Sequence, residues 1–427
     1  MQAERRSLWR RHNALDGGAR PMILVFPEGS WRELMPEQAL YCADPWARQA
    51  ERALRVKIYT HEHFDADHVV EPTFNTSHHV GDTGWGLETK RHASGSPTGA
   101  YGFAPTMQTL ADAKKLRHPQ VTVDDAAADR ELALAQDVLG DILSVRKKGV
   151  THLSCPLTAL FTGWRGLDQF CLDLIDEPNW VHNTMAFITE GMVGLRRQWE
   201  SLGLLSLNNA DDYHSSGGLG YTDDLPAAGF EPGRVRCRDV WGSAESQEMT
   251  MISPEMHREF VMQYEARFIE PFGLNGYGCC DDLTGKLDVV CSLPNMRRIS
   301  ISPFADVVRC AEQLRGRAIL SWKPHPGDLV GGFRPEIVRT RIRTAVEAAA
   351  DYGCVLEMIL KDTHTCEQNP GRFTAWTRIA REQVARICER CGRWGHAAPM
   401  PAGLPAWSVA GNLHECDQNQ VWRNHAR

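Results

Sequence analysis

The chain has 427 residues, of which 42% are hydrophobic and 24% are charged, an ordinary globular composition that excludes extensive disorder. Its net charge of -7 excludes a general attraction to nucleic acid or to an anionic membrane, so a small molecule is the expected partner. The N-terminus lacks the apolar stretch of a signal peptide, and no run of about 18 apolar residues occurs. With an odd number of cysteines, 13, we expect a cytoplasmic protein with reduced thiols.

The first 65 residues are predicted to form an extension that precedes the main domain. A short apolar run at residues 20–27 predicts a strand, and residues 36–56 predict a helix with apolar positions spaced by seven. Residues 75–105 are rich in Gly, Ser, Thr and His and show neither helical nor strand periodicity, so we expect a long loop there. The extension is expected to pack on the outside of the domain that follows.

From residue 130 onward, helical patterns alternate with apolar runs typical of strands. One strand is expected before this region, at residues 69–74. The others are expected at residues 150–155, 204–208, 274–280, 298–302, 318–322 and 355–360. Helices are expected at residues 130–148, 166–202, 254–271, 304–315, 335–352 and 371–391. Seven or eight strand-helix units with near-continuous apolar strands favour an α/β fold with a parallel (β/α)8 TIM barrel. A doubly wound sheet is the alternative, although no Gly-x-Gly-x-x-Gly motif follows an early strand.

These elements divide the chain into three expected parts. The first is the N-terminal extension at residues 1–65, and the second is the barrel at residues 66–395. The third is a C-terminal tail at residues 396–427, where several prolines and a polar end are typical of irregular structure.

The ends of the predicted strands carry many reactive side chains, as expected where a barrel builds its active site. They include Glu71, Cys155, Asp212, Cys279, Cys280, Ser302, Lys323, Lys361, His364 and Cys366. Thiolates and imidazoles on rigid strand ends are ligands that zinc prefers. On an extended segment His364 and Cys366 face the same side and can join Cys279 around one ion. The alternative is that the cysteines are small buried hydrophobic residues.

Five segments of the chain carry patterns that point to a known group. They are residues 241–248 (Trp-Gly-Ser-Ala-Glu-Ser-Gln-Glu), 253–261 (Ser-Pro-Glu-Met-His-Arg-Glu-Phe-Val), 277–280 (Tyr-Gly-Cys-Cys), 293–303 (Leu-Pro-Asn-Met-Arg-Arg-Ile-Ser-Ile-Ser-Pro) and 321–326 (Ser-Trp-Lys-Pro-His-Pro). Over residues 20–392 the chain resembles the uroporphyrinogen decarboxylase-like superfamily, and within it the branch grouped with corrinoid-dependent methyltransferases. The resemblance implies a (β/α)8 barrel and, for the methyltransferases, a zinc ion that activates a thiol to accept methyl from a corrinoid.

Two departures from the family's patterns bear on the activity. The Arg-Gln-Ala-Gly-Arg-Tyr segment with which uroporphyrinogen decarboxylase clamps its substrate's carboxylates does not occur, so decarboxylation of a porphyrinogen is not expected. The methyltransferase zinc motif is His-x-Cys followed far downstream by Cys. Here Tyr277 stands in the place of the histidine, while Cys279 and Cys366 match the two cysteines. With His364 as the replacement imidazole, the predicted metal ligands are Cys279, His364 and Cys366.

The main hypothesis is a zinc-dependent methyltransferase with Asp212, Glu248 and Lys323 as catalytic residues. Because no Asp-x-His-x-x-Gly segment occurs in the chain, the corrinoid is expected on a partner protein. One alternative is a metal-free lyase, such as a decarboxylase, in which these three residues and Lys361 handle a carboxylated substrate. Another is a non-catalytic module that binds a tetrapyrrole or a corrinoid protein.

Two other sequence patterns are weaker candidates for metal binding. Residues 61–68 (His-Glu-His-Phe-Asp-Ala-Asp-His) are similar to the motif of metallo-β-lactamase-type hydrolases, but two residues separate Asp65 from the last histidine, which favours a polar loop. A second set has the spacing of a structural zinc site, namely Cys388, Cys391, His396, His414 and Cys416. Its first two members lie on a predicted helix, where cysteines three apart often face the core.

Overall fold

The main sheet is parallel, and its strands follow one another in sequence order. They are β1 (Met22–Val25), β8 (Ser154–Cys155), β9 (Trp241–Ala244), β10 (Leu274–Tyr277), β11 (Met296–Ile301), β12 (Ile319–Trp322) and β13 (Leu356–Leu360). The computed structural model describes residues 1–93, 101–214, 216–392 and 394, and in it the strands pair in the order β1-β13-β12-β11-β10-β9-β8. Each pairing is parallel.

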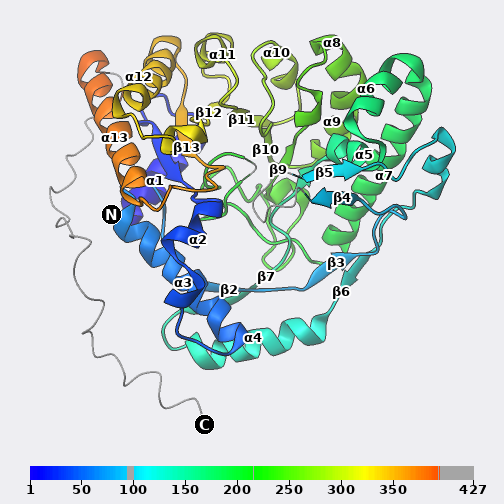
Figure 1. The fold of residues 1–427 in the computed structure, drawn as a ribbon. Helices are drawn as coiled ribbons and strands as arrows, with labels where there is room; N and C mark the ends of the chain where they lie inside the picture. Colours follow the sequence, from blue (N-terminus) through cyan, green and yellow to red (C-terminus); the bar gives the residue numbers. More distant parts are fainter. Residues whose placement is uncertain (94–100, 215, 393, 395–427) are drawn as a thin grey trace. The chain divides into compact units, whose positions relative to one another are not determined.

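This strand order distinguishes between the two expected architectures. From β8 to β13 each strand lies beside its neighbour in the sequence, and the first strand, β1, lies beside the last, β13, which is the order of a (β/α) barrel. No pairing of β1 with β8 occurs in the described residues. In a doubly wound sheet the order would reverse at a switch point. The predicted fold class, α/β with the TIM-barrel arrangement, is therefore confirmed (Figure 1).

The N-terminal segment supplies a strand of the barrel and is not an extension outside it. Within the predicted extension of residues 1–65, β1 pairs with β13 from Met22–Glu357 to Val25–Leu360. The reason is that β1 consists of four consecutive apolar residues, all buried, as in strands that are covered on both faces. Contacts group Met1–Gly395 into one unit. The predicted tail at residues 396–427 lies outside the described residues.

Two expected strands take other forms. In place of a strand at residues 69–74, β2 (Thr73–Ser77) pairs with β7 (Ser144–Lys148) in a separate two-stranded parallel sheet. The strand expected at residues 204–208 is reduced to a single bridge between Leu205 and Val150. The segment expected to be a long loop contains short antiparallel pairs, which join β3 (Val80–Asp82) to β6 (Val121–Val123) and β4 (Lys90–Ala93) to β5 (Tyr101–Ala104). Their short, polar sequences give no periodic signal.

Helices alternate with the strands along the chain. They are α1 (Gln2–Asn13), α2 (Trp31–Leu34), α3 (Pro45–His63), α4 (Asp125–Leu139), α5 (Leu157–Arg165), α6 (Leu167–Asp176), α7 (Pro178–Ser201), α8 (Pro254–His257), α9 (Gln263–Ile269), α10 (Leu287–Val290), α11 (Val307–Leu314), α12 (Pro335–Tyr352) and α13 (Gly371–Cys391). Figure 1 shows α11, α12 and α13 side by side, and α12 packs on both of the others. The single helix expected at residues 166–202 is interrupted because Pro178 begins a new helix. Within the described ranges, no helix is long and apolar enough to cross a membrane.

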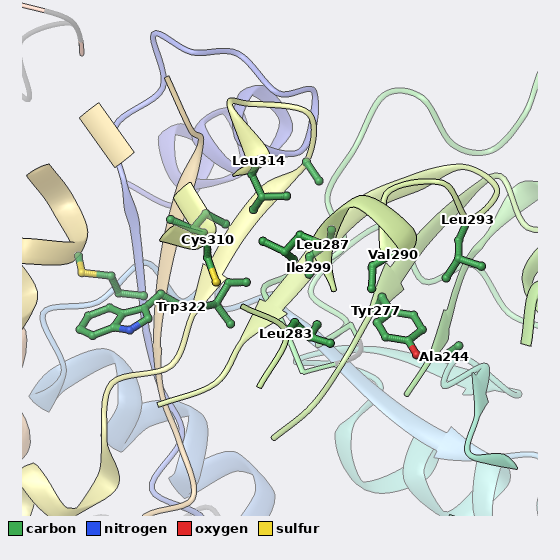
Figure 2. Close-up of a cluster of buried hydrophobic side chains, with 14 of the residues drawn as sticks. Ala244, Tyr277, Leu283, Leu287, Val290, Leu293, Ile299, Cys310, Leu314 and Trp322 are labelled. Carbon is green, nitrogen blue, oxygen red and sulfur yellow. The ribbon is translucent and has the colours of Figure 1, made fainter. Parts of the chain in front are cut away.

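Side chains of the barrel strands alternate between an outer apolar layer and the barrel interior. Ile299 of β11 belongs to the main hydrophobic core, and Figure 2 shows it among Leu287 of α10 and Leu314 of α11. On the other face, Leu24 of β1 belongs to a separate cluster with Trp9 of α1. The N-terminal helix is therefore held against the inner side of the sheet.

Candidate active site

The residues that follow four strands of the sheet meet at its carboxyl edge. Glu245 follows β9, Cys279 follows β10 after one glycine, Lys323 follows β12 and Lys361 follows β13. Cys279 is their common neighbour. Its thiol lies close enough to the Glu245 carboxyl group to raise the pKa of that group, and it interacts electrostatically with both lysines. We call Glu245, Cys279, Lys323 and Lys361 the mouth site, since parallel strands of a barrel build the active site at this edge.

The backbone around Gly278 holds Cys279 in place. Gly278 has a φ of +89°, a conformation that favours glycine, and a Cβ atom there would lie 3.1 Å from Leu283 Cδ1. The amide of Cys279 donates to Asp281 Oδ1 at 3.0 Å, and its carbonyl oxygen accepts from Ser300 Oγ at 2.8 Å. The chain can therefore turn sharply after β10 and still keep the Cys279 thiol at the strand end.

Cys279 and Cys280 form a pair of adjacent thiols. Their Sγ atoms lie 3.7 Å apart, and Cys280 is exposed whereas Cys279 is half-buried. The hydrogen bond with Cys280, together with burial, raises the pKa of Cys279. The same hydrogen bond lowers the pKa of Cys280. The more accessible thiol is therefore also the more acidic one.

Glu245 is the acid of the mouth site. Burial, followed by the adjacent Cys279, raises the pKa of Glu245 to about 8. The carboxyl groups of Glu248 and Asp281 raise it further because they add negative charge nearby. At neutral pH Glu245 therefore keeps its proton and can donate it to a substrate.

The two lysines of the mouth site differ in their charge. Lys323 is 2% exposed and donates to the carbonyl oxygen and to Oγ of Ser321, at 2.9 and 2.8 Å. Burial lowers the pKa of Lys323 to about 7 in spite of the attraction of Glu357. Burial disfavours the charged form of Lys361. The electrostatic interactions with Asp362, Cys279 and other neighbours have the larger combined effect, and they raise the pKa of Lys361. Lys361 is thus a permanent cation, while Lys323 titrates near neutrality.

A second buried network secures the strands that carry Glu245 and Cys279. The hydroxyl of Tyr277 donates to Glu265 Oε2 at 2.9 Å and lies 2.8 Å from Ser246 Oγ and 3.0 Å from His257 Nε2. Burial raises the pKa of Glu265 and lowers the pKa of His257 to about 3, so both are neutral. The Tyr277 hydroxyl therefore links the end of β10 to Ser246, just after β9, and to Glu265 of α9, and Figure 2 shows the Tyr277 side chain near Ala244, the last residue of β9.

The three catalytic residues predicted from the sequence have different environments. Lys323 belongs to the mouth site. Glu248 accepts a hydrogen bond from Thr158 Oγ1 at 2.6 Å and adds its charge to the surroundings of Glu245. Asp212 forms an ion pair of 2.7 Å with Lys148, the last residue of β7. The structure therefore brings two of the three predicted residues to the carboxyl edge of β9 and β12.

The predicted metal ligands Cys279, His364 and Cys366 are not brought together. Cys366 is fully buried and its Sγ donates to Glu33 Oε2 at 3.1 Å, while His364 is exposed. The segment after β13 is no longer a strand, and His364 is exposed whereas Cys366 is buried, so these two side chains do not face one side. Across the part of the chain that the structure describes, no three His, Cys, Asp or Glu side chains are grouped to hold a metal ion.

In the two weaker metal patterns, the residues that the structure describes have structural roles. Asp67 is buried between Arg20 at 2.7 Å and Arg381 at 2.8 Å. His68 is half-buried, and its Nε2 accepts from the backbone of Val25 at 3.1 Å. Cys388 is buried on α13. The remaining residues of that second set, apart from the helical backbone of Cys391, lie outside the described residues.

Glu245 is a candidate site residue that the sequence alone did not single out. Its strand, β9, has only four residues, Trp-Gly-Ser-Ala, and neither glycine nor serine favours a strand. The sequence does show an acidic residue directly after Trp-Gly-Ser-Ala, within one of the segments that resemble the family. In the structure this stretch pairs with a strand on each side. Had this stretch been assigned as a strand, the position of Glu245 at its carboxyl end would have identified it.

Comparisons with known proteins give limited additional information. No protein-family model and no curated protein sequence matches the chain. A solved structure of a methyltransferase from Methanosarcina mazei is similar with a TM-score of 0.45 and 12% sequence identity, over 88% of this chain and 98% of that chain. A likeness of this degree carries no functional argument. The conclusions below therefore rest on the mouth site.

Proposed function

We propose that the protein is a lyase, such as a decarboxylase, that acts on a small carboxylated molecule by acid-base chemistry at the mouth site. The observation that carries this proposal is that a protonated carboxyl group, Glu245, and a charged amine, Lys361, face the same side chain, Cys279. A cation can bind and orient a substrate carboxylate, and an acid can protonate the carbon that keeps the electron pair when carbon dioxide leaves.

Each group has a distinct part in the proposed reaction. The Lys361 ammonium, whose side chain is 12% exposed, binds and orients the substrate carboxylate. The bond between this carboxylate and the adjacent carbon breaks, and its electron pair stays on the carbon. Lys323 stabilises the negative charge that develops there, and Glu245 gives its proton to the carbon. Solvent then returns a proton to Glu245.

The test is a screen of small carboxylated compounds for release of carbon dioxide. We expect turnover of at least one compound by the wild-type protein and loss of most of it in Glu245→Gln and Lys361→Met, which remove the acid and the cation. Glu336→Gln, an acid-to-amide change at an exposed position of α12, serves as the matched control and keeps full turnover. Equal turnover in all four proteins would contradict the assignment of the mouth site.

Methyl transfer that involves zinc and a corrinoid protein is the second candidate function. It is supported by Cys279, which stands at the end of β10 where the family motif places its first cysteine. The Cys366 thiol, however, is held by Glu33, so the proposed ligand set lacks a third member. Stoichiometric zinc in protein purified without chelator, together with demethylation of methylcobalamin, would favour this candidate over the lyase.

A further inference from the structure

The adjacent thiols at the end of β10 have a geometry suited to a reaction with each other. The Sγ atoms of Cys279 and Cys280 lie 3.7 Å apart, and the Lys361 ammonium interacts with both of them. Among the cysteines in the described ranges, Cys280 is the exposed one and the others are half-buried or buried. A nearby cation favours the thiolate, which is the reactive form of cysteine. Accessibility and charge therefore coincide at this one pair.

We propose that Cys279 and Cys280 form a reversible oxidation site that closes into a disulfide between adjacent residues by exchange with a small disulfide such as oxidised glutathione. In the first step the Cys280 thiolate attacks one glutathione sulfur, forms a mixed disulfide and releases one glutathione thiolate. In the second step Cys279 attacks the Cys280 sulfur and releases the second glutathione. The two protein thiols are oxidised, the glutathione disulfide is reduced, and the two thiol protons pass to the released glutathione thiolates.

The order of the two steps follows from the positions of the two thiols. Cys280 is exposed and meets the oxidant first, whereas Cys279 is half-buried beside Glu245 and Ser216. Its sulfur is close to Cys280 Sγ, so it acts as the resolving thiol once the mixed disulfide has formed. This proposal requires only the two thiols and does not depend on the reaction proposed for the mouth site.

The product is expected to be easy to reduce. Consecutive Cα atoms across a trans peptide are about 3.8 Å apart, shorter than the roughly 4.4–6.8 Å that disulfides usually span. Closing the ring therefore strains the backbone, and strained disulfides are the labile, regulatory ones. A short exposure to reductant should restore both thiols.

The test uses the full-length reduced protein with oxidised glutathione as the probe. After remaining thiols are alkylated, trypsin releases the peptide of residues 268–286, whose only cysteines are Cys279 and Cys280. Mass spectrometry should show that this peptide has lost two hydrogens and taken up no alkylating agent, and that dithiothreitol reverses the change. In Cys279→Ser the same peptide should stop at the glutathione adduct.

Two further variants complete the test. In Cys280→Ser the first reaction at this peptide should be about tenfold slower or more, because the half-buried thiol is then the only attacker. Cys171→Ser removes a half-buried thiol of α6 that has no cysteine neighbour in sequence, and should leave closure unchanged. A wild-type protein that accumulates a stable glutathione adduct at residues 268–286, or that reacts at Cys171 and leaves this peptide unmodified, would overturn the proposal.

Discussion

Arg298 Nε lies 3.0 Å from Glu357 Oε1 in the barrel interior, where the two side chains are 1% and 0% exposed. The second oxygen of Glu357 lies 3.1 Å from His12 Nε2 of the N-terminal helix. Burial alone would raise the pKa of Glu357, but Arg298 and His12 outweigh it and lower the pKa. The pair thus joins β11 to β13 across β12, and Glu357 also attracts Lys323.

Replacing Arg298 should therefore strongly destabilise the protein. Arg298→Met leaves a buried carboxylate without its main partner, and we expect the free energy of unfolding to fall by about 3–5 kcal/mol. Urea denaturation followed by circular dichroism measures this change. The double variant Arg298→Met with Glu357→Leu should lose less than the sum of the single variants, because no unpaired charge remains. A single-variant loss below about 1 kcal/mol would show that the pair is not structurally important.

The pKa of Glu245 sets the pH dependence of turnover. Its value in the folded protein, about 8, lies above the ordinary 4.5, so the folded protein retains a proton that the unfolded chain releases between these values. The stability contributed by this group is fully present below pH 4.5 and is lost as the pH rises toward 8. In the folded protein Glu245 loses its proton only as the pH passes about 8, so kcat/KM should fall there with an apparent pKa of about 8, after an earlier fall caused by loss of the Lys323 charge at a pKa of about 7.

The variant Glu245→Gln provides the comparison for this pH profile. It should lower kcat by roughly 10²- to 10⁴-fold and remove the fall near pH 8, because an amide cannot donate the proton, while the fall near pH 7 that Lys323 causes remains. Rates measured from pH 5 to 10 test both statements. A fall near pH 8 that persists unchanged in the variant would assign that titration to another group.

The sequence was sufficient to predict the barrel because its later strands alternate with clear helical patterns. The runs that became β10, β11, β12 and β13 were all placed correctly to within a few residues. β1 was recognised as a strand but was assigned to an outer extension, since a four-residue run carries no sign of its distant partner β13. Pairing between residues more than 300 positions apart depends on the tertiary structure and cannot be read from local periodicity.

The candidate site was predictable only in part. Strand-end reasoning identified Cys279, Lys323 and Lys361, and these do meet at the mouth site. It failed for Cys366 because the segment after β13 was assumed to be extended, whereas it is no longer a strand. It also could not show that Glu33, far away in sequence, would bind this thiol. Side-chain partners of this kind arise from tertiary contacts.

Cys366 should matter for stability and not for metal content. Its Sγ donates to Glu33 Oε2, and burial, followed by this contact, raises the pKa of Cys366 to about 11. We expect Cys366→Ala to lower the free energy of unfolding by about 1 kcal/mol, the usual net value of a hydrogen bond. Metal analysis by mass spectrometry should give the same content as for the wild type. Loss of stoichiometric zinc in this variant alone would restore Cys366 as a ligand.

Gly278 should tolerate substitution poorly because of its backbone conformation. At a φ of +89° an alanine is strained, and its Cβ would press on Leu283 at 3.1 Å. Gly278→Ala is therefore expected to cost about 1–3 kcal/mol and to displace Cys279 from Glu245. Thermal unfolding and the alkaline pKa of kcat/KM report these two effects. Gly285→Ala, at a site with open space and no unusual φ, is the matched control.

The most direct test of the central claim compares turnover after chelation with turnover after loss of the acid. With a compound that the wild-type protein converts, the mouth site predicts full activity in protein dialysed against a zinc chelator and loss of activity in Glu245→Gln. Activity that disappears on chelation, returns with added zinc and survives in Glu245→Gln would contradict the acid-base account and establish metal-dependent chemistry instead.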